Sequence, residues 1–392
     1  MMEDFGLRIA GLCAFDVKDD PLLKAFSALG KGTTAESAAA YSEICRLLLV
    51  SGKSLSGYLH DLLIYSGSPL LTECAKNPTE LRKKAVECDL RIISKICEYT
   101  SDRLKIQLSD AYNNRAFTGL PDFEKGSFNY TAEDFIEFTR NNGSGIFAKY
   151  KGFSFSDGEL HPVENTDPIR LRDLKNYEAQ RNQVVENTIC FLNGKPAQNV
   201  LLYGDRGTGK SSTVKAILNE YDNLRMIELP KNDVGALPKL FRQLKDIPLH
   251  FIITIDDLTF TENDDRFGIL KAALEGSLSA RPENILIYAT TNRRKIVKET
   301  VADREINGAD SIDESMSLAD RFGLFVTFTK PNRDGYLDIV KKLAADRGID
   351  VPEDKLCMAA DRFSVKRGGY SPRIAKQFID WLKGRVDLGM EY

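Results

Sequence analysis

A glycine-rich segment followed by a lysine and two serines has the clearest chemical meaning in this sequence. It fits the pattern GxxxxGK[ST] at every position and lies between a predicted strand, 199–203, and a helix expected to begin near Ser211. Glycines let the backbone fold around an anion, and a helix N-terminus supplies free N–H groups with a partial positive charge. We therefore predict a phosphate-binding loop that consists of Gly204, Asp205, Arg206, Gly207, Thr208, Gly209, Lys210, Ser211 and Ser212.

Two adjacent carboxylates follow the apolar run 251–255, at the edge where parallel sheets bind ligands. We expect Lys210 to contact the β and γ phosphates and Asp256 to hold Mg²⁺ together with the Ser211 hydroxyl. Asp257 takes the place where such sites usually carry a glutamate that orients or deprotonates the attacking water. Its side chain is one methylene shorter, so hydrolysis is expected to be slow or to depend on a partner. The alternative is a turn with two solvated acids.

An amide and two guanidinium groups complete the predicted site. Asn292 follows the apolar run 285–289, where it either hydrogen-bonds the attacking water or the γ-phosphate, or caps a turn. Arg321 precedes the last predicted strand and is a candidate arginine finger for a neighbouring subunit, unless Asp320 neutralises it within one chain. Arg373 lies in the first turn of the last helix, where the helix dipole disfavours a cation unless an anion such as phosphate is near. A surface ion pair is the alternative for this arginine.

Strand-like and helix-like runs alternate from residue 167 onward, a pattern typical of an α/β fold with a parallel sheet flanked by helices. The predicted strands are 200–203, 225–229, 251–255, 285–289 and 325–328. Three helical patterns follow Pro331, near 333–347, 353–363 and 371–386, and they predict a small helical lid after the sheet. The carboxyl ends of the strands then bring the polar residues above to one edge.

We expect the chain to have four parts. Amphipathic helical patterns dominate the N-terminal part, where Thr33 and Glu36 form a capping box. A glycine-rich stretch follows and ends in a small hairpin turned by Asp157-Gly158. The expected parts are a mainly helical N-terminal domain at 1–118, a connector with the hairpin at 119–165, the α/β nucleotide domain at 166–331 and the helical lid at 332–392.

The composition of the 392 residues is that of an ordinary globular protein, with 42% hydrophobic and 28% charged residues. The formal net charge is −3, so no overall positive field indicates nucleic acid. No apolar run approaches the ~20 residues of a membrane helix, and the N-terminus lacks the basic and apolar regions of a secretory signal. We therefore expect a cytoplasmic protein without membrane contact.

In their order along the chain, the phosphate loop, the acidic pair, Asn292, Arg321 and Arg373 resemble Walker A, Walker B, sensor 1, the arginine finger and sensor 2 of the AAA+ ATPases. The resemblance covers about residues 165–390. More narrowly, the chain is similar to an uncharacterised bacterial family of AAA+ ATP-binding proteins classed as a domain of unknown function. The segments that carry this similarity are 167–171 (DPIRL), 204–212 (GDRGTGKSS), 256–258 (DDL), 273–276 (ALEG), 280–284 (ARPEN) and 292–294 (NRR).

The resemblance implies that the segment 169–174, beginning with Ile169, packs on adenine and that the lid closes over the nucleotide. It also implies that an aspartate at the position of Asp257 is a family trait. The sequence has no NKxD-type motif, so we expect ATP rather than GTP. The stretch 229–235 lacks the aromatic-apolar-glycine pore loop that peptide-threading AAA+ machines usually carry, which disfavours an unfoldase.

These features together predict an ATPase that uses Mg²⁺, converts ATP to ADP and forms a homo-oligomer, for instance a ring of six subunits, in which Arg321 completes the neighbouring site. The N-terminal domain is then expected to recognise an unknown protein client and to move with the nucleotide state. One alternative is a slow-turnover binding switch or loader. Another is a nucleic-acid remodelling ATPase, which needs basic surface near 293–295 or 362–367.

Overall fold

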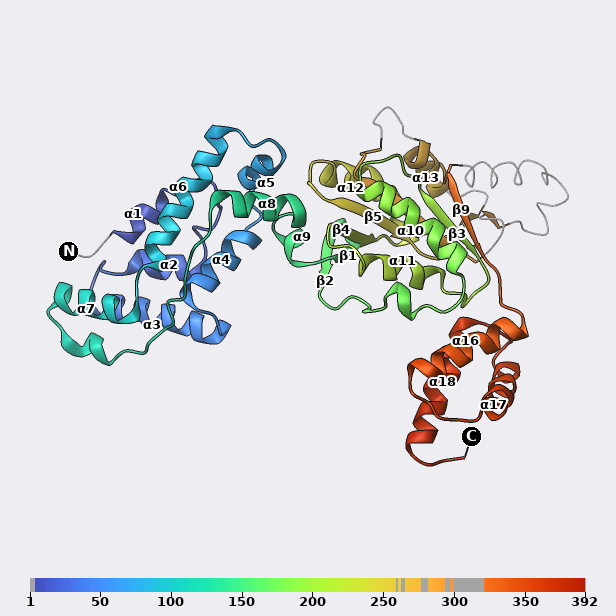
Figure 1. Ribbon diagram of the computed structural model, residues 1–392. Helices are drawn as coiled ribbons and strands as arrows, with labels where there is room; N and C mark the ends of the chain where they lie inside the picture. The colour runs from blue at the N-terminus through green and yellow to red at the C-terminus, as the bar shows by residue number, and fades with distance from the viewer. Residues whose placement is uncertain are drawn as a thin grey trace. The chain divides into compact units, whose positions relative to one another are not determined.

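The computed structural model describes residues 4–258, 260–261, 265–275, 281–292, 297–298 and 321–391. These residues form two compact units (Figure 1). The first unit consists of Met1–Tyr150 with Ile247–Leu249, and the second consists of Lys151–Asp246 with His250–Tyr392. Each unit has its own buried apolar core.

The first unit is mainly helical, as the sequence predicts. Its α3 begins at the expected capping box, where the Glu36 N–H donates to the Thr33 hydroxyl at 3.3 Å and the Thr33 N–H donates to the Glu36 carboxylate at 2.7 Å. The helices are α1 (Phe5–Ala10), α2 (Pro21–Ala28), α3 (Thr34–Ser51), α4 (Leu55–Tyr65), α5 (Pro69–Lys76), α6 (Glu80–Cys97), α7 (Ser101–Tyr112), η1 (Arg115–Gly119), α8 (Ala132–Asn142) and α9 (Ile146–Lys149).

A buried carboxylate ties the start of the first unit to α6. Asp89 is 0% exposed and accepts hydrogen bonds from the backbone N–H groups of Cys13, Ala14 and Phe15 at 3.0, 2.7 and 3.0 Å. The Phe15 ring packs edge-on against Phe135, with their centroids 5.6 Å apart. The carboxylate thus gives partners to three backbone donors, and burial would otherwise leave those of Ala14 and Phe15 unpaired.

A seven-stranded sheet forms the centre of the second unit, in the order β2-β1-β4-β5-β7-β3-β9. Its strands are β1 (Gly152–Ser156), β2 (Glu159–Val163), β3 (Val200–Gly204), β4 (Leu224–Glu228), β5 (His250–Ile255), β7 (Ile285–Thr291) and β9 (Leu324–Phe328); β6 (Phe260–Thr261) pairs separately with β8 (Val297–Lys298). Every pairing in the large sheet except β1 with β2 is parallel. All five predicted strands are present, so the predicted α/β class is confirmed.

Helices follow the strands, as parallel connections require. They are η2 (Leu171–Asp173), α10 (Glu178–Leu192), α11 (Lys210–Leu218), η3 (Lys231–Ala236), α12 (Leu237–Leu244) and α13 (Asp265–Glu275). On one face of the sheet, Val184 of α10 and Val214 of α11 pack with Leu202 and Ile252. This packing fixes the N-terminus of α11 at the carboxyl end of β3.

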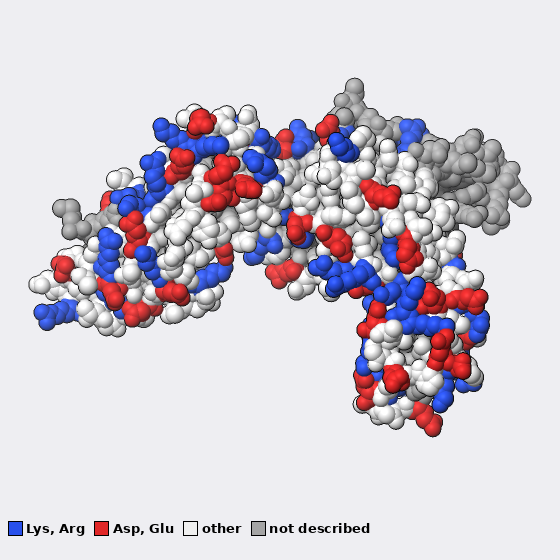
Figure 2. Space-filling view, in the orientation of Figure 1, with Lys and Arg blue, Asp and Glu red and all other residues white. Residues whose placement is uncertain are grey.

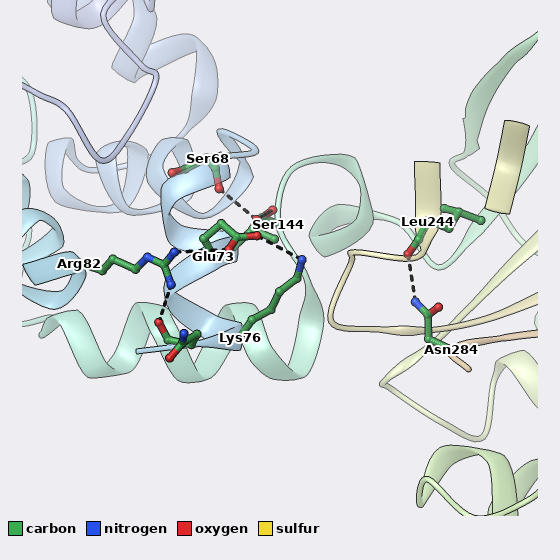
Figure 3. Close-up of polar contacts among 9 residues, drawn as sticks. Ser68, Glu73, Lys76, Arg82, Ser144, Leu244 and Asn284 are labelled. Carbon is green, nitrogen blue, oxygen red and sulfur yellow. Dashed lines mark hydrogen bonds and ion pairs between the residues drawn. The ribbon is translucent and has the colours of Figure 1, made fainter. Parts of the chain in front are cut away.

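Polar contacts fix helix ends in both units (Figure 3). In the first unit, Arg82 of α6 donates to the Asn77 carbonyl at 2.9 Å and lies 3.6 Å from the Glu73 carboxylate of α5. In the second unit, the Asn284 amide donates to the Leu244 carbonyl at 3.0 Å, which ties the residue before β7 to the end of α12. Such contacts hold the helices in register with their neighbours while the apolar cores supply most of the stability.

The expected hairpin is present, and it belongs to the sheet. β1 pairs with β2, and Asp157 and Gly158 make the turn with φ values of 53° and 80°, as a two-residue turn with both central residues at positive φ requires. The same β1 also pairs in parallel with β4, with Gly152 opposite Met226. The sequence predicts the turn but gives no sign of this second pairing, because strand order depends on contacts between distant segments.

The rest of the expected connector lies in the first unit. The stretch before Tyr150 contains α8, whose Phe135 and Ile136 are buried in the first core. The two units therefore meet in sequence between Tyr150 and Lys151. The expected boundary at residue 118 differs because the glycines and aromatic residues after it resemble a linker in composition, although Phe123 and Phe135 are buried in the first core.

Three helices form the expected lid, α16 (Arg333–Asp346), α17 (Glu353–Lys366) and α18 (Pro372–Asp387). They have a core of their own that includes Tyr336 and Phe378, both 0% exposed. The Ser371 hydroxyl caps α18 by accepting from the Ile374 N–H at 3.3 Å, and Pro372 is the first helical residue, as predicted. Within the described ranges, no helix has the length and apolar character that crossing a membrane requires.

Candidate nucleotide and metal site

The predicted phosphate loop joins β3 to α11 and is anchored to β9. Gly204 has φ 136°, and a Cβ there would lie 2.0 Å from the Phe328 carbonyl oxygen, so only glycine fits. The Asp205 N–H donates to that carbonyl at 3.0 Å, and the Asp205 carboxylate accepts from the Lys330 N–H at 2.9 Å. The strand that leads into the lid therefore positions the first half of the loop.

Lys210, the first residue of α11, carries a buried ammonium group. It is 5% exposed and donates to the carbonyls of Gly204 and Asp205 at 2.9 and 2.8 Å and to the Asn292 amide oxygen at 3.0 Å. Burial lowers the pKa of Lys210, and the nearby carboxylates oppose that shift. Neutral oxygens compensate the charge of the buried ammonium only in part, so the group still attracts an anion.

Ser211, Asp256 and Thr290 converge from three elements. The Ser211 hydroxyl of α11 donates to Asp256 Oδ1 at 2.7 Å, and the Thr290 hydroxyl at the end of β7 donates to the same oxygen. A hydroxyl and a carboxylate are hard oxygen donors of the kind that Mg²⁺ binds together with phosphates and water. The side chains present therefore fit the predicted metal.

Asp257 and Asn292 form a second polar pair beside the first. The Asn292 amide donates to Asp257 Oδ1 at 2.7 Å while its oxygen accepts from Lys210. Asp257 has φ 51°, a left-handed conformation that is uncommon for a residue other than glycine, and its N–H donates to the Thr290 hydroxyl at 3.1 Å. The structure thus brings the predicted water-orienting residues together through one amide.

Arg373 contacts the loop through the backbone of α18. Its N–H donates to the Gly207 carbonyl at 3.1 Å, and a Cβ on Gly207, which has φ 76°, would lie 3.2 Å from the Arg373 Cβ. Glycine at this position therefore lets the first turn of the lid helix approach the loop. Lys376 follows one turn later on the same helix and lines the same cavity.

A cavity of about 910 Å³ lies over the loop, between the sheet edge and the lid. Its size is that of a ligand pocket. The lining contains seven Lys or Arg and five Asp side chains, and Figure 2 shows Lys and Arg gathered where the α/β part meets the lid helices. The expected residues that line the cavity are Ile169, Arg206, Gly207, Thr208, Gly209, Lys210, Ser211, Ser212, Asp256, Asp257, Asn292 and Arg373.

Other residues of the cavity have no motif in the sequence. Lys175, Arg181 and Arg347 add positive charge to the lining, and burial lowers the pKa of Arg181. Lys376 could have been predicted from the sequence, because it follows Arg373 by three positions and residues three apart lie on one face of a helix. Lys175, Arg181 and Arg347 could not, because their segments reach the loop only through the packing of α10 and the lid.

The other predicted functional residues do not line this cavity or lie outside the described residues. Arg321 is exposed and lies outside this cavity. Its expected neighbour Asp320 and the basic run 293–295 lie outside the described residues. The second basic stretch, 362–367, is the C-terminal end of α17 with its cap residue Arg367, whose guanidinium lies 5.2 Å from the centre of the Phe363 ring.

Comparison with protein families gives one match to more than half of the chain. The family described as "Protein of unknown function (DUF815)" matches residues 148–386. This range contains the hairpin, the phosphate loop, the acidic pair and the lid as far as residue 386.

Comparison with curated proteins gives partial matches. The chain is 23% identical over 171 residues to a probable spastin homolog of Brugia malayi, covering 37% of this chain and 38% of the relative. It is 27% identical over 171 residues to the proteasome-activating nucleotidase of Methanoregula boonei, covering 41% and 38%. It is 35% identical over 81 residues to the replication factor C large subunit of Staphylothermus marinus, covering 20% and 17%. The chain thus spans less than half the length of each of these relatives.

Among solved structures, the Thermotoga maritima RuvB Holliday junction branch migration motor is similar with a TM-score of 0.41 and 15% identity. The similarity covers 56% of this chain and 66% of that chain.

Proposed function

The chain belongs to this family of unknown function and to the AAA+ class, and on that premise we propose that it binds ATP with Mg²⁺ and hydrolyses it to ADP and phosphate. The observation that carries the proposal is the Lys210 ammonium, held among neutral oxygens beside the Ser211–Asp256 pair. A partly desolvated cation next to two oxygen ligands for a metal suits a triphosphate.

Each part of the ATP molecule has chemically matched residues in the cavity. The backbone N–H groups of the loop and the side chain of Lys210 would bind the phosphates. Ile169 and the lid residues Ile339 and Leu343 offer apolar surface to the adenine base. Binding would therefore draw the lid and the α/β part together around one ligand.

Ser211 and Asp256 would hold the magnesium ion. When bound, Mg²⁺ supplies positive charge that offsets the negative charge on the phosphate oxygens. Thr290 keeps the Asp256 carboxylate oriented through the hydroxyl that donates to it. Ser211 and Asp256 would thus bind the metal directly, and Thr290 would orient the Asp256 carboxylate.

Asp257 and Asn292 would position the attacking water. Asn292 donates to one carboxylate oxygen of Asp257, so the second oxygen is left to accept a proton from water. The same amide accepts from Lys210, and the water-orienting pair is therefore tied to the phosphate-binding cation. Arg373, which lines the cavity, would act on the phosphates of its own chain.

Arg321 would act on the site of a neighbouring subunit, because it does not line the cavity of its own chain. We propose a homo-oligomer built by heterologous contacts, for instance a ring of six subunits. The first unit would bind a protein client whose arrangement changes with the nucleotide.

The ATPase rate per subunit as a function of protein concentration tests the proposal. We expect the rate to rise from nanomolar to micromolar protein as subunits assemble. Arg321→Ala should remove the rise without weakening ATP binding, and Lys210→Ala serves as the control that cannot bind phosphate. A rate that is flat up to tens of micromolar, with Arg321→Ala equal to wild type, contradicts the shared site. No hydrolysis at any concentration, together with no ATP binding, contradicts the ATPase itself.

A slow nucleotide switch is the second candidate function. It is favoured by the short side chain of Asp257 and by its bond to Asn292, which has to be retained or rearranged when a water is activated. Single-turnover hydrolysis with Mg²⁺ distinguishes the two functions. Bound ATP that survives for hours favours the switch, and conversion within seconds to minutes favours the motor.

A further inference from the structure

A second cavity, of about 230 Å³, lies behind the first, between α11, the β1–β2 hairpin and the neighbouring strands. Its inner wall is apolar and consists of buried side chains, each at most 6% exposed: Phe153, Val214, Leu218, Met226 and Tyr288. An apolar cavity of about 150 Å³ is enough to bind benzene. This recess therefore has room for one aromatic ring or a branched aliphatic group.

The polar side of the recess is acidic. Asp167, Glu228 and Asp256 contribute three carboxylates to its lining, and Lys215 contributes the single ammonium. Glu228 is exposed at the end of β4, and within the described ranges its carboxylate has no hydrogen-bond or ion-pair partner. A net charge of −2, three carboxylates less one ammonium, disfavours anionic ligands and attracts cationic ones.

The recess shares a wall with the nucleotide cavity. Asp167, Ser211, Asp256 and Thr290 line both cavities, so the proposed magnesium ligands face the nucleotide on one side and the recess on the other. A charge placed in the recess would act on the magnesium position across this shared wall, because Asp256 borders both cavities.

We propose that the recess binds a small organic cation, an aromatic or branched aliphatic group that carries an ammonium, and that this ligand opposes Mg²⁺ binding. The apolar body fills the space against Met226 and Tyr288, and the cation lies between Glu228 and Asp256. A second positive charge beside Asp256 weakens the attraction of that carboxylate for the metal. The coupling is reciprocal, so Mg²⁺ weakens the binding of the organic cation by the same factor. Only this coupling rests on the proposed function; the ligand site does not.

The test uses 2-phenylethylammonium as the probe and 2-phenylethanol as its neutral counterpart, with the full chain and no metal, measured by ligand-observed NMR titration. We expect saturable binding of the amine about tenfold tighter than that of the alcohol, the loss that follows from removing one charge interaction near a protein surface. Glu228→Gln should weaken the binding of the amine about fivefold to tenfold and leave the affinity for the alcohol unchanged. Glu159→Gln, which removes an exposed acid of β2 that lines neither cavity, should change neither.

Each result decides a separate part of the proposal. Absence of saturable amine binding to the wild type overturns the site. Equal affinities of amine and alcohol, or an unaffected Glu228→Gln, overturn the requirement for a cation. Met226→Phe narrows the recess and should weaken both probes; unchanged binding shows that the probes lie elsewhere and overturns the site.

A second titration tests the coupling, with Mg²⁺ added to the ADP-bound chain in the presence and absence of the amine. We expect the amine to raise the Kd of Mg²⁺ by the factor by which Mg²⁺ raises the Kd of the amine. Independent binding of the two overturns the coupling. If neither ADP nor Mg²⁺ binds, the proposed ATPase fails while the amine site stands, so the two failures are distinguishable.

Discussion

The two units bury ionisable side chains in different ways. In the first unit, Lys105 is 6% exposed and lies 2.5 Å from the Asp122 carboxylate, an opposite charge that compensates its burial. In the second, Lys210 is 5% exposed and donates only to neutral oxygens, of Gly204, Asp205 and Asn292. Equal burial therefore has different consequences, since only the second lysine retains a strong attraction for an added anion.

The aspartates of the two units differ in the same sense. Asp89 of the first unit is 0% exposed, and backbone N–H groups that cannot turn away hold its carboxylate. Asp256 of the second unit accepts from two hydroxyls, which can rotate toward another acceptor, and it borders two cavities. Fixed donors and full burial make a carboxylate structural, whereas rotatable donors and an open side leave it able to bind a ligand.

Replacing the two lysines should give the largest difference. We expect Lys210→Met to weaken ATP binding about 1,000-fold, because charge-assisted hydrogen bonds to phosphate are lost. Lys105→Met should leave ATP affinity within about twofold, since its partner Asp122 is exposed and belongs to the first unit. Calorimetric titration of each variant with ATP measures both. Similar losses in the two variants would break the comparison.

Asp257→Asn should separate chemistry from binding within the second unit. We expect the rate of ATP hydrolysis to fall on the order of 10²–10³-fold, the size of a general-base contribution, with ATP affinity retained. The control is Asp16→Asn, which changes an exposed residue of the first unit. Single-turnover kinetics and equilibrium ATP titration are compared for both. A loss of affinity as large as the loss of rate would place Asp257 in nucleotide binding.

Asp89→Asn should affect mainly the stability of the fold, and Asp256→Asn mainly the binding of Mg²⁺. The first places an amide among three backbone donors and is expected to lower the free energy of unfolding by about 2–3 kcal/mol. The second should change that free energy by less than about 1 kcal/mol, since Asp256 is exposed, while weakening Mg²⁺ binding. Urea unfolding and Mg²⁺ titration of both variants check this. The reverse pattern would show that Asp256 is the structural carboxylate.

The pH dependence of stability should give the smallest effect. The pKa of Lys210 is lowered in the folded chain, so the unfolded chain binds more protons between that pKa and the ordinary value of 10.5. Stability should therefore contain a contribution that rises with pH in this window. In Lys210→Met that contribution is absent, and urea unfolding at several pH values below 10.5 should show a shallower rise. Identical slopes in wild type and variant would contradict it.

The sequence by itself determined the local parts of this protein. The loop from Gly204 to Ser212, the apolar strands and the Ser371 cap each depend on residues close together in the chain, whose spacing limits the backbone conformations open to them. The resemblance to AAA+ ATPases rests on the order of such segments, because Lys210, the Asp256–Asp257 pair and Asn292 follow β3, β5 and β7 in turn. These features are readable without knowing which segments lie side by side.

Only the tertiary structure decided which of those residues meet. Asn292 bonds both Lys210, 82 positions away in the sequence, and Asp257, 35 positions away. Lys175 and Arg181 line the cavity without any motif. The place of β1 beside β4, and with it the acidic recess, depends on strand order. Strand order is set by the burial of whole faces against one another, a sum over many weak contacts that local spacing does not encode.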